Sequence, residues 1–129
     1  MPLVGERGTV ASLNTPDSLN GANALNPENR YPQWQQTVAA RSALRVGFYR
    51  PGRFARRIHC PLLVLAYEGD GVATPGPAIR AAHRAPQGRV AWLPGGHYAA
   101  FIDAEEQTAH VMLSFLERAA ASSRRKVAR

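Results

Sequence analysis

Two side chains of complementary chemistry, a carboxylate and an imidazole, follow two apolar segments in the second half of the sequence. Asp70 lies in the polar run 68–71 after the first segment, and His97 follows the Pro-Gly-Gly turn at 94–96 after the second. A carboxylate that accepts a hydrogen bond from an imidazole fixes the tautomer and orientation of the ring, which can then take a proton from a nucleophile. The pair is therefore typical of nucleophilic hydrolysis, provided that the fold brings the two side chains together.

The apolar segments have the composition of strands. Residues 62–66 are a continuous run of Leu, Val and Ala, which is typical of a strand covered on both faces. Residues 89–93 predict a second strand. Residues 78–85, between the two strands, predict a helix. Asp103 followed by the Glu residues at 105 and 106 predicts a capped helix start, and apolar side chains every three or four positions from Ala109 predict a closing helix that runs to about residue 121. The order strand, helix, strand, helix predicts an α/β fold with two parallel strands and flanking helices.

Parallel strands would bring Asp70 and His97 to the same edge of the sheet. In open parallel sheets, functional groups lie on the loops that follow the C-terminal ends of the strands. Neighbouring strands are about 4.8 Å apart, so we expect the two side chains within hydrogen-bonding distance. Tyr98 and Phe101 follow the histidine directly and are candidates for lining a substrate pocket, although packing explains them equally well.

Residues 58–118 resemble the C-terminal portion of the α/β-hydrolase family. The run Ile-His-Cys-Pro-Leu-Leu-Val at 58–64 is similar to the family's penultimate core strand. The run Glu-Gly-Asp-Gly-Val at 68–72 is similar to its acid loop, and Pro-Gly-Gly-His-Tyr at 94–98 to its histidine loop. The resemblance implies that Asp70 is the acid and His97 the base of a Ser-His-Asp triad that cleaves an ester or another acyl bond.

The sequence departs from this family at the nucleophile. In the α/β-hydrolase fold the nucleophile precedes the acid, on a Gly-x-Ser-x-Gly elbow between a strand and a helix. The serines before Asp70 are Ser12, Ser18 and Ser42, and none has both flanking glycines. Cys60 precedes its strand and therefore lies at the wrong end of it. We expect a truncated hydrolase, or one half of an enzyme whose nucleophile is on another polypeptide, that is inactive alone.

The remainder of the chain has weaker patterns. Residues 1–33 are rich in Asn, Pro and Gly and predict loops and turns, and residues 34–46 predict a helix. Residues 50–57 form a basic connector, and residues 34–53 resemble, more distantly, the end of the lid of an α/β-hydrolase. We expect an irregular and helical lid-like segment at 1–57, a βαβα unit at 58–121 and a basic tail at 122–129.

The charge and the cysteine content of the sequence limit the partners and the cellular compartment that we expect for the protein. The net charge is +7, and basic side chains form two runs, Arg50, Arg53, Arg56 and Arg57, and Arg124, Arg125, Lys126 and Arg129. Such runs can bind phosphates, but a solvated connector and tail explain them more simply, so nucleic acid is a weak expectation. The sequence predicts a cytoplasmic protein, because it has one cysteine, no secretory leader after Met1 and no apolar run near ~20 residues.

No cofactor and no metal are expected, since the histidines lack metal-ligand spacing.

A two-stranded sheet is incomplete, because independent stability usually needs three or more strands. Residues 62–66 are apolar on both faces, Trp92 is expected in the core, and an unpaired strand edge favours pairing with another chain. The alternative function is therefore a non-catalytic interaction module that pairs with a partner through this edge. The partners expected at the edge are a complementary hydrolase half or a second copy of the chain. The substrate, the partner and the oligomeric state do not follow from the sequence.

Overall fold

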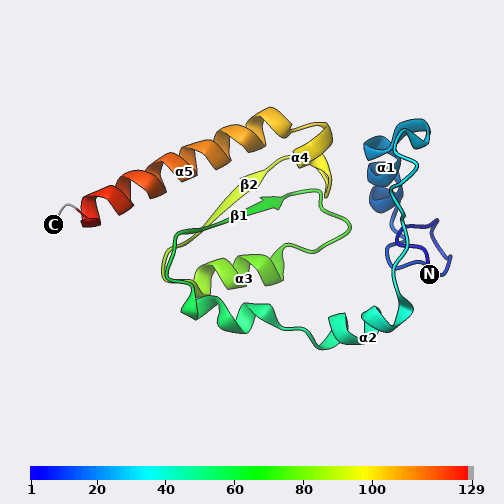
Figure 1. The fold of residues 1–129 in the computed structure, drawn as a ribbon, viewed down its shortest axis with the longest axis horizontal. Helices are drawn as coiled ribbons and strands as arrows, with labels where there is room; N and C mark the ends of the chain where they lie inside the picture. Colours follow the sequence, from blue (N-terminus) through cyan, green and yellow to red (C-terminus); the bar gives the residue numbers. More distant parts are fainter. Residues whose placement is uncertain (128–129) are drawn as a thin grey trace.

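The computed structural model describes residues 1–127, with the side chains of all of these except 43, 44 and 125–127, and shows a mixed α/β chain (Figure 1). Strands β1 (Leu62–Tyr67) and β2 (Gly88–Leu93) form a two-stranded parallel sheet. Leu62 pairs with Gly88 at one end and Tyr67 with Leu93 at the other. The predicted pair of parallel strands is confirmed, and each strand differs from its prediction by one residue.

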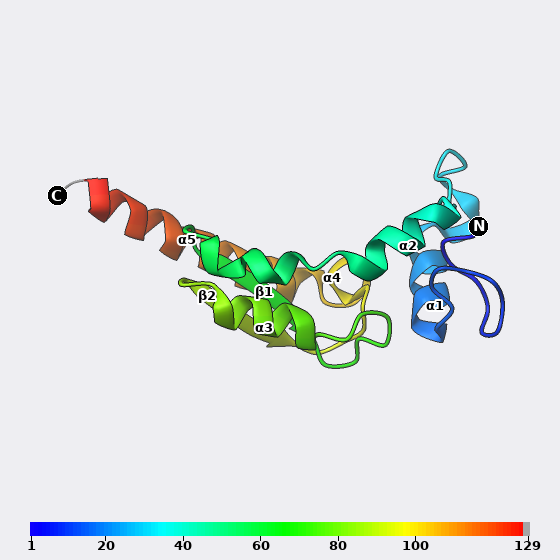
Figure 2. The same ribbon diagram turned by 90° about the horizontal axis from the view of Figure 1, so that it is seen from below.

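The sheet lies between two layers of helix. Helix α5 (Glu105–Val127) lies along one face, and α3 (Gly76–Arg84) with the 3₁₀ segment η2 (Pro51–Arg57) lies along the other (Figures 1 and 2). Gly88 starts β2 directly beneath the end of α3, where a Cβ atom would collide with the carbonyl oxygen of Ala82. This close approach lets the chain turn from helix to strand within a few residues.

A small core joins the sheet to the helices near its C-terminal edge. Tyr67, Leu93 and Ala99 are buried together, and Val111 of α5 packs against them. The Tyr67 hydroxyl is 2.8 Å from the hydroxyl of Thr108, so the one polar atom of the ring is satisfied. The loops that follow β1 and β2 start from this packed end, which holds them in place.

The end of the chain differs from its predicted form. A one-turn helix, α4 (Ala99–Ile102), follows the histidine loop, and Asp103 ends α4 instead of capping the closing helix. Helix α5 starts at Glu105 and continues beyond the predicted end at 121. Residues 122–127 of the predicted tail therefore belong to α5, whereas Arg129 lies outside the described residues.

The first segment contains a helix that the sequence prediction of loops at 1–33 missed. Helix α1 (Pro16–Leu25) is capped by Thr15, whose hydroxyl accepts a hydrogen bond from the Ser18 amide at 3.2 Å. Proline in the first turn and an acidic side chain beside it stabilise the helix start. Its buried face uses Ser18, Gly21 and Ala22, which give no apolar period to detect. A 3₁₀ turn, η1 (Pro27–Asn29), follows.

The helix predicted at 34–46 begins later, as α2 (Ala40–Phe48). The backbone of the preceding residues is used elsewhere, because Val38 N donates to Met1 O at 2.9 Å and Leu3 N donates to Gln36 O at 2.8 Å. A helix through these positions would break both contacts with the start of the chain. The predicted bounds were therefore wrong at the N-terminal end of this helix.

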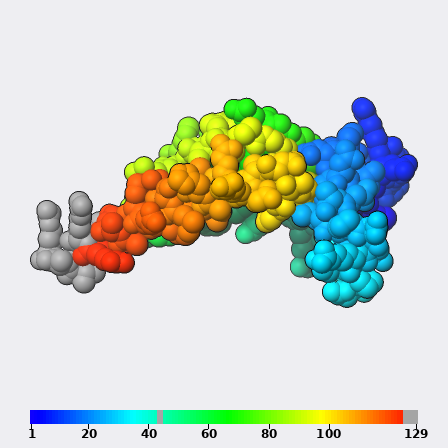
Figure 3. All heavy atoms as spheres, turned by 90° about the horizontal axis from the view of Figure 1, so that it is seen from above, coloured from blue at the N-terminus to red at the C-terminus, as the bar shows by residue number. Residues whose placement is uncertain are grey.

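The molecule is extended (Figure 3), and many of its large apolar side chains are exposed. Its accessible surface is 9819 Å², whereas a folded monomer of 14.0 kDa is expected to expose about 6,700 Å². Trp92, expected in the core, is 52 % exposed and lies on the opposite face of β2 from buried Leu93. None of the described helices has the length and apolar content to cross a membrane.

Candidate functional site

The loops that follow β1 and β2 run side by side at the C-terminal edge of the sheet. Glu68 N donates to Leu93 O at 3.1 Å, and Gly69 N donates to Gly95 O at 2.9 Å. A Cβ atom at Gly69 would lie 3.1 Å from that same oxygen, so glycine permits the close approach. Gly95 has a φ of +108°, which glycine adopts without strain, and it turns the chain toward His97.

Asp70 and His97 are brought into direct contact by these loops. Asp70 Oδ2 lies 3.0 Å from His97 Nδ1, across 27 positions of sequence. The aspartate side chain is 11 % exposed and the imidazole 35 %. The carboxylate is thus fixed under the surface, while the ring is accessible to a group approaching from solvent or from another polypeptide.

Two hydrogen bonds to Oδ1, the oxygen that does not contact His97, fix the Asp70 side chain. Oδ1 accepts from the amides of Val72 at 2.9 Å and Ala73 at 2.8 Å. Burial by itself raises the pKa of this carboxyl, but the hydrogen bonds from His97, Ala73 and Val72 and the nearby imidazole charge outweigh it. The pKa of Asp70 is therefore below its ordinary value, and the group is a carboxylate at neutral pH.

The charge state of Asp70 determines the tautomer of neutral His97. A carboxylate can only accept hydrogen bonds, so the ring must donate through Nδ1. Nε2 then has the free lone pair and can act as a base. Among the described residues no hydrogen bond to Nε2 is found, so its lone pair is open to a reacting group.

Tyr98 links the histidine to helix α1. Its ring meets the imidazole edge-on, with ring centroids 4.9 Å apart and an interplanar angle of 86°. On its other side the ring lies against Gly21, where a Cβ atom would overlap it. Burial, followed by the charges of Asp17 and Asp70, raises the pKa of the Tyr98 hydroxyl. Tyr98 is thus held between the histidine loop and the first segment.

Asp17 is a site residue that the sequence reasoning missed. Its Oδ2 accepts a hydrogen bond from the His97 backbone amide at 3.2 Å, although the two residues are 80 positions apart. A Cβ atom at Gly96 would lie 2.8 Å from Asp17 Oδ1, so that glycine leaves room for the carboxylate. The available signal was the Thr-Pro-Asp sequence of a capped helix start, which would have placed Asp17 at a helix N-terminus but not beside His97.

A small cavity lies next to this contact. Its volume is about 180 Å³, and Tyr98, Asp17 and Gly21 are among the residues that line it. Phe101, the other candidate pocket residue, is 72 % exposed and does not line this cavity. The structure thus places Tyr98 beside the Asp70–His97 pair and leaves Phe101 on the surface.

The described residues do not place a nucleophile at His97. Ser18 is fully buried, and its hydroxyl lies 2.6 Å from that of Thr15. Ser42 lies in α2, and Cys60 is exposed ahead of β1, at the opposite end of the strand from Asp70. No cluster of three His, Cys, Asp or Glu side chains suited to a metal ion is found in the described part of the chain.

Comparison with known proteins gives one informative match. No family model matches the sequence, and no solved structure matches it significantly. The chain is 32 % identical, over 120 residues, to the quorum-quenching protein AidA of Acinetobacter baumannii (strain MDR-ZJ06). The alignment covers 92 % of this chain but 38 % of that protein. The chain thus spans about two fifths of the length of this curated relative.

Proposed function

We propose that this chain supplies the acid and the base of a Ser-His-Asp triad in an α/β-hydrolase that cleaves ester or other acyl bonds. The observation that carries the proposal is the 3.0 Å contact between Asp70 Oδ2 and His97 Nδ1. These side chains come from the loops after two adjacent parallel strands, where open α/β sheets have their functional groups.

In this proposal each residue has a distinct role. His97 takes the proton of a serine hydroxyl through Nε2 as the serine attacks the acyl carbon, and returns it to the leaving group. In the second half of the reaction His97 deprotonates the water that attacks the acyl carbon, and returns this proton to the serine oxygen as the bond between serine and the acyl group breaks. Asp70 keeps Nε2 unprotonated beforehand and stabilises the imidazolium that forms. Asp17 is a positioning residue, because it holds the backbone of His97 and touches no reacting atom.

In this proposal the nucleophile and the oxyanion donors lie on another polypeptide segment, because none of the serines before Asp70 has both flanking glycines of a nucleophile elbow. Without them the pair has no group to activate and no developing charge to stabilise. We therefore propose that the chain alone is inactive and that the complete enzyme includes a polypeptide segment that carries the serine elbow. The uncovered apolar surface supports this proposal, because Trp92 and α5 residues such as Leu113 and Leu116 are more than half exposed.

The name of the AidA relative suggests a biological process in which the complete enzyme would act. Its name states that it quenches quorum sensing, and the matched segment includes most of this chain. We propose that the complete enzyme acts in the same process, on a small molecule with an acyl bond.

Active-site labelling tests this function. A serine-directed fluorophosphonate should leave the purified 129-residue chain unlabelled. A chimera of the AidA relative, in which this chain replaces the matched segment, should be labelled and should quench a quorum-sensing reporter. Both signals should be lost with His97→Ala and kept with His110→Ala, an exposed histidine on α5. Full activity of the His97→Ala chimera would contradict the proposal.

The second candidate function is a non-catalytic interaction module, which the exposed apolar side chains also favour. In that case partner binding does not depend on the imidazole, so it should survive His97→Ala unchanged. Loss of function together with kept partner binding in this variant supports the hydrolase instead.

A further inference from the structure

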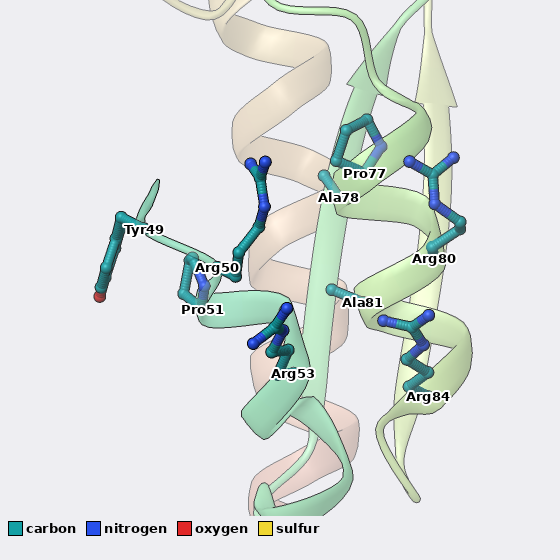
Figure 4. A pocket seen from close by; sticks show the side chains of 10 residues that line it. Tyr49, Arg50, Pro51, Arg53, Pro77, Ala78, Arg80, Ala81 and Arg84 are labelled. Atoms are coloured by element: carbon teal, nitrogen blue, oxygen red, sulfur yellow. The ribbon is translucent and has the colours of Figure 1, made fainter. Parts of the chain in front are cut away.

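We propose that a cavity between η2 and α3, apart from the Asp70–His97 pair, binds a small organic phosphate. The cavity has a volume of about 490 Å³, within the range of about 300–1,000 Å³ that is typical of small-molecule sites. It is lined by four arginines, Arg50, Arg53, Arg80 and Arg84, around a floor of proline and alanine (Figure 4). The proposal is independent of the proposed hydrolytic function.

The two elements that form the cavity are in direct contact. A Cβ atom at Gly52 would lie 3.8 Å from the Cβ of Ala81, and Ala55 and Ala82 are buried. Small residues at this seam let η2 approach α3 closely. The arginines rise from both sides of the seam, two from the η2 side and two from α3 (Figure 4). The shape of the cavity thus depends on how η2 packs against α3, and not only on the arginine side chains.

Local structure places the arginines of each pair near one another. Arg50 immediately precedes η2 and Arg53 lies in its first turn, where Arg53 N donates to Arg50 O at 3.2 Å. Arg80 and Arg84 are four positions apart on an α-helix, where like charges repel and destabilise the helix. All four are exposed, and within the described residues none of them forms an ion pair with a carboxylate. The lining includes no acidic residue, so a bound anion would relieve repulsion among these arginines.

The chemistry of the lining indicates the class of ligand. Guanidinium groups match phosphate oxygens with two parallel hydrogen bonds, and several around one anion favour a doubly charged group. The floor of Pro51, Pro77, Ala78 and Ala81 is apolar, and it suits a hydrocarbon or aromatic body attached to the phosphate. Inorganic phosphate would leave these apolar residues exposed to water, whereas an organic phosphate would cover them, so the organic phosphate should bind more tightly.

Titration of the ¹⁵N-labelled chain with phenyl phosphate tests the site. The amides of Gly52 and Ala81, which line the cavity, should shift in a saturable manner. Inorganic phosphate at the same ionic strength should bind at least tenfold more weakly. Equal affinity for the two ligands, or no saturable shift at these amides, would overturn the proposal.

Paired variants separate the cavity from general positive charge. Arg53→Gln with Arg84→Gln should weaken phenyl phosphate binding at least tenfold, since charged hydrogen bonds of this kind are each strong. Arg7→Gln with Arg56→Gln makes the same charge change at exposed arginines that do not line the cavity, and should change affinity less than threefold. Equal losses in both double variants would show nonspecific attraction and refute the site. Arg53→Lys with Arg84→Lys keeps the charge and should give an intermediate loss, because lysine lacks the two-pronged geometry.

Discussion

The Asp17 carboxylate accepts a hydrogen bond from the backbone amide of His97, with Oδ2 3.2 Å from the nitrogen. This contact ties the start of α1 to the histidine loop across 80 positions of sequence. It acts on the backbone of His97, while Asp70 acts on its ring. Two aspartates from different segments thus restrain the same residue in different ways.

Replacing Asp17 should loosen the histidine loop. Asp17→Ala removes the acceptor, so the His97 amide should exchange with solvent about tenfold faster in NMR hydrogen-exchange measurements, which corresponds to about 1.4 kcal/mol. Asp17→Asn keeps an acceptor oxygen and should have a smaller effect. Asp103→Asn, an exposed carboxylate nearby, is the control and should leave this exchange unchanged. Equal exchange in the wild type and Asp17→Ala would contradict the role.

The same substitution should alter the titration of Tyr98. Burial and the charges of Asp17 and Asp70 raise its pKa, so loss of one charge in Asp17→Asn should lower the pKa toward the ordinary value. Burial and Asp70 remain, so part of the upward shift should persist. An NMR pH titration of the Tyr98 ring measures this change, and a Tyr98 pKa that does not move would show that Asp17 is not near the hydroxyl in solution.

Gly21 should be intolerant of any side chain. Its position faces the Tyr98 ring so closely that a Cβ atom would overlap it. Gly21→Ala should therefore displace α1 and lower the free energy of unfolding by about 1–3 kcal/mol in urea denaturation. Gly47→Ala is a matched control in α2, with open space at the Cβ position, and should stabilise by up to about 1 kcal/mol. A neutral Gly21→Ala would show that α1 does not pack there.

The features that depend on local pattern could be predicted from the sequence. The apolar run at 62–66 and the turn before His97 are local signals, and both strands and the Asp70–His97 contact followed from them. Asp17 could not be found this way, because its partner is a backbone amide that only the folded chain brings near. Helix α1 was missed because it contacts its neighbours through glycine and small residues. Trp92 was misplaced because the pattern of one strand does not show how completely neighbouring elements cover each of its side chains.

Acid should remove the contribution of Asp70 to stability. Its pKa is lower in the folded chain than its ordinary value of 3.8, so the carboxylate stabilises the fold fully above about pH 4. This stabilisation is lost as the pH falls through the lower folded pKa, where both states are protonated. Asp70→Asn should therefore lower the free energy of unfolding by about 1 kcal/mol at pH 7 and by progressively less below pH 4. Urea denaturation at several pH values measures the difference. A gap of constant size down to pH 2 would contradict the lowered pKa, and Asp103→Asn serves as control.

The exposed apolar face of α5 should promote association. Met112, Leu113 and Leu116 are 45 %, 60 % and 55 % exposed and neighbour one another at helical spacing. We expect the chain to self-associate in sedimentation experiments, and Leu113→Lys with Leu116→Lys should weaken this at least tenfold. Ala120→Lys with Ser123→Lys adds the same charge to exposed positions of α5 and should have a smaller effect. A wild-type chain that stays monomeric at high concentration would contradict this expectation.

The proton on the His97 ring is the most direct test of the acid–base pair. Long-range ¹H–¹⁵N correlation of the imidazole at pH 8 distinguishes its two neutral tautomers. The 3.0 Å contact with Asp70 Oδ2 predicts a proton on Nδ1 and a free lone pair on Nε2, and Asp70→Ala should remove this preference. A proton on Nε2 in the wild-type chain would contradict the proposed roles of both residues.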